Sequence, residues 1–173
     1  PPPYDFAIEA IRCAMASAKP SFCNHRMYSK DFSGNYVIAS CYNGLAYGGG
    51  AYTLVRLILS NIAKRAKDRK DFLEKELPYI MDLCVRYMDE RIRFIVEESG
   101  FFENNFLAKE GFIHRDRFSA MFGLVGLAEA VNILLEKEGK GDCRFGHSKE
   151  ATELGVEIMD CISAFNEAHK NPY

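Results

Sequence analysis

Cys41 lies between a short apolar run and a glycine-rich loop, and this segment carries the strongest chemical signal in the sequence. The apolar run covers residues 36–39, and the loop over 42–51 contains Gly48-Gly49-Gly50. The end of a strand, beside glycines that can adopt positive φ, is a suitable position for a reactive thiol. The alternative is that Cys41 is a small buried hydrophobic residue, which is the common state of a free cysteine.

The other residues able to bind metals or phosphate do not form a recognised motif. The six cysteines and four histidines have no zinc-ribbon or Cys-x-x-Cys spacing, so we expect reduced thiols and no metal site. The glycine loop is followed by no Gly-Lys-Ser/Thr sequence, which excludes a Walker A loop, and it lacks Gly-x-Gly-x-x-Gly spacing.

Composition limits the classes of protein that this chain can represent. The sequence has 173 residues, 48% hydrophobic and 27% charged, which suits one globular domain. A net charge of −2 without a basic cluster argues against nucleic-acid binding. No apolar run approaches the roughly 18 residues of a membrane span, and no signal-peptide pattern is seen at the start. We therefore expect a cytoplasmic protein without a membrane partner.

Hydrophobic periodicity predicts five helices separated by short extended pieces. The helical patterns cover 5–19, 53–68, 70–98, 126–138 and 149–169, and the extended segments are 36–41 and 118–124. We expect residues 36–41 to form a parallel strand covered on both faces, and 21–35 and 100–117 to be loop-rich. Pro78 should kink the third helix or mark its true start. The pattern indicates a helix-rich α/β fold with few strands.

The positions expected to face the core follow from the same periodicity. In the helix over 70–98 they are Leu73, Leu77, Ile80, Cys84, Tyr87 and Ile95. Cys13, Cys84 and Cys161 also fall on apolar helix faces, where they are expected to be packing residues. Two strands cannot cover the apolar faces of five helices, so part of the fold is expected to be missing.

Two longer motifs in this sequence resemble a known family. Ser40-Cys41, the glycine loop and Tyr52-Thr53-Leu54-Val55-Arg56-Leu57 resemble the cysteine-loop segment of glycyl radical enzymes, in the branch near the anaerobic ribonucleotide reductases. Residues 117–130 are similar to the Phe-Ser…Val-Gly…Glu-Ala element of the same family, and 153–160 match the helix that follows more weakly. The resemblance covers roughly residues 35–170 and is greatest to the YjjI-type glycyl radical proteins.

The resemblance implies a radical mechanism centred on Cys41. In this family a backbone glycyl radical takes a hydrogen atom from a cysteine, and the thiyl radical then abstracts hydrogen from a small substrate. A partner S-adenosylmethionine radical enzyme with an iron–sulfur cluster installs the glycyl radical, so the chain itself is expected to bind no cofactor. Candidate substrate-binding residues are Asn43, Ser119, His25 and Arg26. The alternatives are that Asn43 is a polar group at the end of the strand, that Ser119 is a buried serine bonded to the backbone, and that His25 and Arg26 lie on a surface loop.

The sequence departs from the family pattern in ways that limit the interpretation. It contains neither the glycyl radical loop nor the Cys-Cys pair of pyruvate formate-lyase, and the family barrel has ten strands and several hundred residues. We therefore expect residues 1–173 to be a single fragment of a larger α/β barrel domain, lacking the glycyl radical segment and inactive alone. The alternative is a non-catalytic helical interaction domain in which Cys41 is a buried structural residue.

Overall fold

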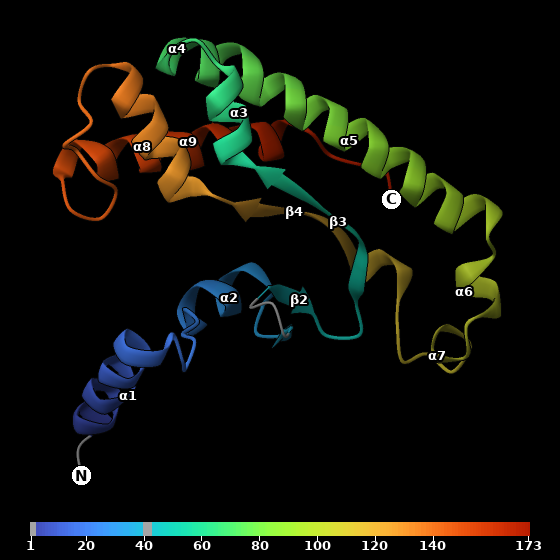
Figure 1. The fold of residues 1–173 in the computed structure, drawn as a ribbon. Helices are drawn as coiled ribbons and strands as arrows, with labels where there is room; N and C mark the ends of the chain where they lie inside the picture. Colours follow the sequence, from blue (N-terminus) through green and yellow to red (C-terminus); the bar gives the residue numbers. More distant parts are fainter. Residues whose placement is uncertain (1–2, 40–42) are drawn as a thin grey trace. The chain divides into compact units, whose positions relative to one another are not determined.

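The computed structural model describes residues 3–39 and 43–173 (Figure 1). The chain divides into two compact units, which are described separately below. The first unit comprises Pro1–Gly50 and Phe112–Phe118, and the second comprises Ala51–Gly111 and Ser119–Tyr173. Within the described ranges helices predominate and the strands form two two-stranded sheets, as the helix-rich prediction with few strands required.

The first unit contains two helices, a β-hairpin and the later segment Phe112–Phe118 with its 3₁₀ turn. Helix α1 covers Pro3–Ser17 and helix α2 covers His25–Asp31. The segment 21–35 was expected to be irregular, but the Asn24 side chain accepts a hydrogen bond from the Met27 N–H (3.2 Å) and starts α2 within it. A helix of two turns shows too few apolar repeats to be recognised from periodicity.

The strand predicted over 36–41 is real but its environment is not the expected one. Strand β1, Tyr36–Ile38, pairs antiparallel with β2, Gly44–Ala46, in the register Tyr36–Ala46, Val37–Leu45 and Ile38–Gly44. Val37 and Ile38 are 42% and 37% exposed, so the prediction of a covered parallel strand is wrong for these residues. The return strand lies inside the glycine-rich segment, where sequence composition favours a loop.

The second unit is built on two strands that each lead into a helix. Strand β3, Gly50–Ile58, precedes α3, Leu59–Arg65, and strand β4, Phe118–Val125, precedes α8, Leu127–Lys137. The two strands pair and run in the same direction towards their helices (Figure 1). The extended segment and the helix predicted over 118–138 are confirmed, although β4 is only partly covered.

The helix predicted to begin at Thr53 begins six residues later. Residues 53–58 belong to β3 instead, because aromatic and β-branched side chains such as Tyr52, Thr53 and Val55 favour extended backbone. Thr53 and Leu57 are buried, whereas Arg56 and Ile58 are exposed. The helical spacing of Leu54, Leu57 and Ile58 is therefore coincidental.

The long helix predicted over 70–98 is present but contains two π-helical turns. It consists of α4 (Arg69–Asp71), the π turn η1 (Phe72–Glu76), α5 (Leu77–Arg93) and the π turn η2 (Phe94–Glu98). Pro78 stands in the first turn of α5, directly after the π turn, where its missing N–H is tolerated. The buried face is Phe72, Leu77, Met81, Met88, Ile92 and Val96, and Tyr87 is 56% exposed, contrary to prediction.

The remaining elements agree closely with the sequence pattern. Helices α6 (Phe101–Asn104) and α7 (Phe106–Lys109) and the 3₁₀ turn η3 (Arg115–Arg117) lie in the loop-rich segment. Helix α9 covers Lys149–Ala168, and Ser148 caps it by accepting a hydrogen bond from the Ala151 N–H (3.2 Å). Among the described helices, none is both long enough and apolar enough to cross a bilayer.

The core of the second unit lies where α3, α8, α9 and the start of the long helix meet. Leu59, Ala63, Phe72, Leu134 and Leu154 are almost completely buried there. Lys137 of α8 reaches the end of α3, where its ammonium group donates to the carbonyl oxygens of Ala63 (2.8 Å), Lys64 (3.1 Å) and Ala66. These bonds satisfy carbonyls that the end of a helix leaves without partners.

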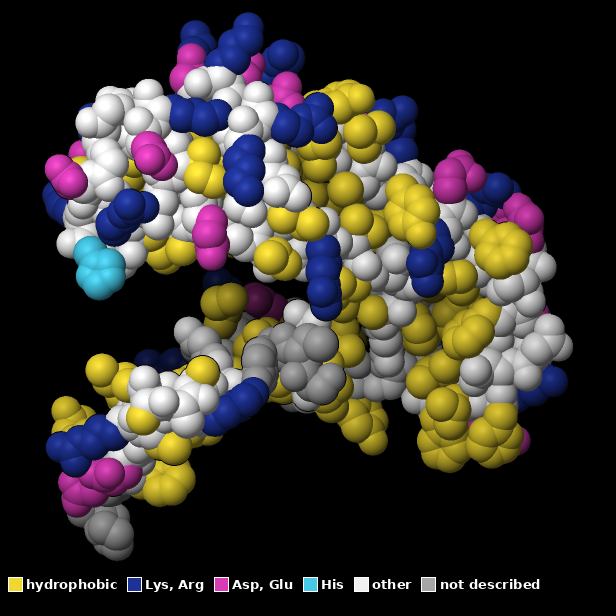
Figure 2. All heavy atoms as spheres, in the orientation of Figure 1, with side chains coloured by type: hydrophobic (Ala, Val, Ile, Leu, Met, Phe, Trp, Pro, Cys, Tyr) yellow, Lys and Arg dark blue, Asp and Glu magenta, His cyan; other side chains and the backbone are white. Residues whose placement is uncertain are grey.

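The outer side of the long helix carries apolar side chains that the core does not cover. Tyr79, Leu83, Tyr87 and Phe94 are all more than one third exposed. Figure 2 shows hydrophobic side chains gathered over this part of the second unit, with basic side chains between them. The helix is therefore apolar on more than one face.

We expect Leu134→Ala to destabilise the second unit by about 2–5 kcal/mol, because the substitution leaves a cavity between α8 and α3. Hydrogen–deuterium exchange of peptides from α3 and α8 measures the loss as faster exchange. Leu107→Ala makes the same change at a position that is 46% exposed, and it should leave those peptides protected. Equal protection in Leu134→Ala and the unsubstituted protein would contradict the assignment of this core.

Candidate active site: the cysteine hairpin

The predicted catalytic residue, Cys41, lies outside the described residues together with Ser40 and Tyr42, but the chain on both sides is described. The Ala39 N–H donates to the Asn43 carbonyl oxygen (2.9 Å), next to the last β1–β2 pair. At the other end of the hairpin the Tyr47 N–H donates to the Asn35 carbonyl oxygen (3.0 Å). The chain therefore enters and leaves the Cys41 segment at two hydrogen-bonded neighbours. We call residues 35–47 the cysteine hairpin.

Aromatic side chains of α2 support the cysteine hairpin. The Tyr28 ring stacks against the rings of Phe32 and Tyr36, with centroid distances of 6.5 and 5.4 Å. Gly44 lies directly under Tyr28, since a Cβ atom there would come within 2.3 Å of the Tyr28 ring. His25 Nδ1 and the Tyr36 hydroxyl share a hydrogen bond of 2.7 Å. An isolated pair of three-residue strands is only marginally stable in water, so these aromatic contacts stabilise the hairpin.

The glycine loop at the base of the hairpin contacts a segment nearly seventy residues later in the chain. Gly48 has a φ of +74°, and the Gly49 N–H donates to the Ala46 carbonyl oxygen (2.9 Å) in a tight turn. The His114 N–H donates to the Gly48 carbonyl oxygen (2.7 Å), and Arg117 Nη1 donates to that of Tyr47 (3.0 Å). The glycine loop and the start of the second sequence motif are therefore in direct contact.

The predicted substrate-binding residues fall in both units. His25 and Arg26 are exposed on α2, and His25 is tied to Tyr36. Asn43 is half-buried and its carbonyl closes the hairpin, whereas Ser119 is exposed on β4 in the second unit. His25 thus lies beside the cysteine hairpin, whereas Ser119 belongs to the second unit.

Sequence reasoning missed two supports of the hairpin. The first is the aromatic pair Tyr28 and Phe32, whose spacing of four residues places both on one side of a helix and could have been noticed. The second is Arg117, whose contact with Tyr47 has no local signal in the sequence.

The other cysteines differ in their surroundings. Burial raises the pKa of the Cys84 thiol, and burial followed by the nearby Glu157 carboxylate raises the pKa of Cys161. These two half-buried residues therefore stay protonated at neutral pH, as packing residues do. Cys13 was also expected to pack inside, but it is exposed, as is Cys23.

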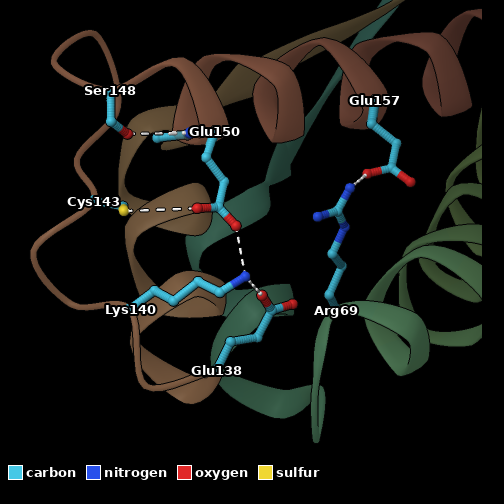
Figure 3. Close-up of polar contacts among 8 residues, drawn as sticks. Arg69, Glu138, Lys140, Cys143, Ser148, Glu150 and Glu157 are labelled. Atoms are coloured by element: carbon cyan, nitrogen blue, oxygen red, sulfur yellow. Dashed lines mark hydrogen bonds and ion pairs between the residues drawn. The ribbon is translucent and has the colours of Figure 1, made fainter.

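A polar cluster around the loop over 139–148 holds a further cysteine (Figure 3). Cys143 Sγ donates to one oxygen of Glu150 (3.8 Å), while Lys140 Nζ pairs with the other (2.5 Å) and with Glu138 (3.4 Å). The hydrogen bond from Lys140 lowers the pKa of Glu150. The cluster ties the loop to the start of α9. Among the described residues no group of His, Cys, Asp and Glu is arranged to hold a metal ion.

Gly44→Ala should loosen the cysteine hairpin, because the added methyl group displaces the Tyr28 ring from Tyr36. Hydrogen–deuterium exchange of the peptide over 43–47 should become faster. The double variant Gly44→Ala/Tyr28→Ala removes the ring that clashes, so the two changes should cost less together than the sum of the single variants. Strict additivity would show that Tyr28 does not rest on Gly44.

Glu150→Gln removes the charge that pairs with Lys140. It should modestly speed amide exchange of the loop over 139–148 at pH 7, by no more than about fivefold, because the pair is exposed. The pKa of Glu150 is lowered from its ordinary 4.5, so the pair stabilises the fold above that value. This contribution is lost as the pH falls through the lower pKa of the folded state, and the variants should then converge. Glu153→Gln, which breaks the exposed pair with Lys149, is the control and should not affect this loop.

The hairpin, the glycine loop and the second motif follow one another in the chain, and comparison with known proteins defines the family to which they belong. The family model described as glycyl radical enzyme YjjI-like matches residues 2–173. The chain therefore belongs to the YjjI-like family of glycyl radical enzymes, as the sequence resemblance predicted.

Two relatives found by comparison carry the description "uncharacterised protein". An uncharacterised protein of Haemophilus influenzae is 43% identical over 169 residues, which is 98% of this chain and 33% of that protein. The uncharacterised protein YjjI of Escherichia coli is 42% identical over 164 residues, 94% of this chain and 32% of that protein. The chain thus spans about a third of the length of these relatives. No solved structure matches it.

Proposed function

We propose that this chain is the cysteine-bearing part of a glycyl radical enzyme and that Cys41 forms its thiyl radical. The observation that carries the proposal is the match of the YjjI-like family model to residues 2–173, a range that contains the cysteine and glycine loop resembling the family's cysteine segment. Cys41 is preferred over the other five cysteines because it alone stands directly before that loop.

The chemistry consists of two hydrogen-atom transfers. A glycyl radical takes the hydrogen atom of the Cys41 S–H bond, which leaves a closed-shell glycine and a thiyl radical. The thiyl radical then takes a hydrogen atom from a C–H bond of the substrate, which leaves a thiol and a substrate radical. S–H and C–H bonds are similar enough in strength for both steps to be reversible. Positioning of the thiol is therefore the main task of the protein.

The rest of the enzyme would come from the remainder of the parent protein and from a partner. The radical glycine and the other strands of an α/β barrel would lie in the longer parent chain, so this segment alone would be inactive. A radical S-adenosylmethionine enzyme with an iron–sulfur cluster would install the glycyl radical. Because oxygen quenches such radicals, the parent would act anaerobically, in the cytoplasm, on a small substrate.

Four side chains are proposed to orient that substrate. Asn43 adjoins the Cys41 segment directly, and His25 and Arg26 lie on the helix that supports the cysteine hairpin. His25 shares its Nδ1 with the Tyr36 hydroxyl, an arrangement that fixes the ring and favours a defined direction for Nε2. Ser119, at the start of the second motif, is the fourth candidate.

Deuterium exchange into the glycyl radical tests the role of Cys41 without knowledge of the substrate. In the activated full-length protein the radical should give an electron paramagnetic resonance doublet, split by the glycine α-hydrogen. In D₂O the thiol carries deuterium, and reversible transfer should replace the α-hydrogen and collapse the doublet. Cys41→Ala should keep the doublet and lose the collapse.

Cys23→Ala is the matched control, since Cys23 is an exposed cysteine of the same unit. This variant should exchange as fast as the unsubstituted protein. If the doublet collapsed at an unchanged rate in Cys41→Ala, or failed to collapse in Cys23→Ala, another thiol would carry the radical.

A further inference from the structure

We propose that the contact between Gly49 and Arg117 positions the Cys41 thiol for hydrogen transfer, with Gly49 and Arg117 as positioning residues. The inference rests on the proposed function of Cys41. It assigns a role to the point where the two sequence motifs meet, and all of the contacts involved belong to the first unit.

The contact at Gly49 leaves no space for a side chain. A Cβ atom there would lie 2.1 Å from the Arg117 carbonyl oxygen and 3.0 Å from that of Ala46. The φ of Gly49 is not in the left-handed region, unlike that of Gly48, so close approach alone requires glycine at position 49. Both neighbouring atoms belong to the backbone, which cannot rotate away as the end of a flexible side chain can. Any larger residue must separate the two segments by about 1 Å.

Three further contacts surround this point and involve the same two segments. Arg117 Nη1 donates to the Tyr47 carbonyl oxygen (3.0 Å), and the His114 N–H donates to that of Gly48 (2.7 Å). The Phe118 ring covers Gly50, where a Cβ atom would lie 2.8 Å from it. Each residue from 47 to 50 is therefore in contact with the segment over 112–118.

The base of the hairpin is linked through its ladder to the two residues that flank the Cys41 segment. The ladder from Asn35–Tyr47 to Ala39–Asn43 is continuous, so a displacement at Tyr47 is transmitted along β2 towards the Cys41 segment. Hydrogen-atom transfer requires near contact between donor and acceptor. A misplacement of about 1 Å in such a site can cost up to about a hundredfold in rate. The base contact therefore acts on the reaction through Cys41, without touching the substrate.

Gly49→Ala in the full-length protein tests the proposal, with deuterium exchange into the glycyl radical as the readout. We expect a full radical doublet after activation but an exchange rate lowered by at least about tenfold. Gly141→Ala is the matched control, because Gly141 has no atom within 4 Å of its would-be Cβ and no positive φ. It should exchange at the unsubstituted rate.

Arg117 provides a second, milder test. Arg117→Ala removes the hydrogen bond to Tyr47 and leaves the backbone contact in place, so it should slow exchange by a smaller factor. Arg117→Lys keeps a cationic donor and should restore most of the rate.

The possible results separate this inference from the proposed function. Unchanged exchange in both Gly49→Ala and Arg117→Ala would overturn the positioning role while Cys41 keeps its own. Loss of the doublet together with the fold in both variants would also overturn it, since the contact would then be a general support. Absence of exchange in the unsubstituted protein would instead remove the proposed function, and this inference with it.

Discussion

The packing of α3 against α8 is the interaction on which the second unit depends. Neither helix can bury its apolar side alone, and each follows directly on a strand of the same two-stranded sheet. Bringing the helices together therefore also sets β3 beside β4. The segments 47–50 and 112–118, where these strands begin, contact each other within the first unit. The two parts of the chain thus meet once through helix packing and once through close backbone contact and the hydrogen bonds of His114 and Arg117.

The helices that agree with the sequence are those with long, regular periodicity. The patterns over 70–98, 126–138 and 149–169 each extend over at least three turns, and Ser148 marks a start that the structure confirms. Strand β3 was misread because Leu54, Leu57 and Ile58 fit a helix as well as a strand over so short a span. The shifted inner face of the long helix has a different cause, because each π turn adds a residue and rotates the face.

For the candidate site the sequence names a reactive residue but not the contacts that support it. Residue type and order single out Cys41, whose role stays a prediction, and the family comparison agrees with the resemblance that motivated it. The stacking of Tyr28 on Tyr36 and the Arg117–Tyr47 bond join residues that local spacing does not relate. One consists of aromatic contact across a helix and a strand, and the other spans 70 residues. Such contacts follow from the three-dimensional path of the chain, which no short pattern encodes.

Lys137 gives the end of α3 an unusual dependence on a distant residue. Most helices end on carbonyls satisfied locally, often through a glycine, whereas here one ammonium group from α8 binds two of the last carbonyls of α3 and the carbonyl of Ala66, the residue that follows. The helix can therefore stop at Arg65 and pass into extended backbone at Ala66 without a glycine. Removal or acetylation of this single cation would leave these carbonyls without their ammonium donor, so the end of α3 would loosen while the apolar core between α3 and α8 stays packed. A charge on one helix thus stabilises the last turn of its neighbour.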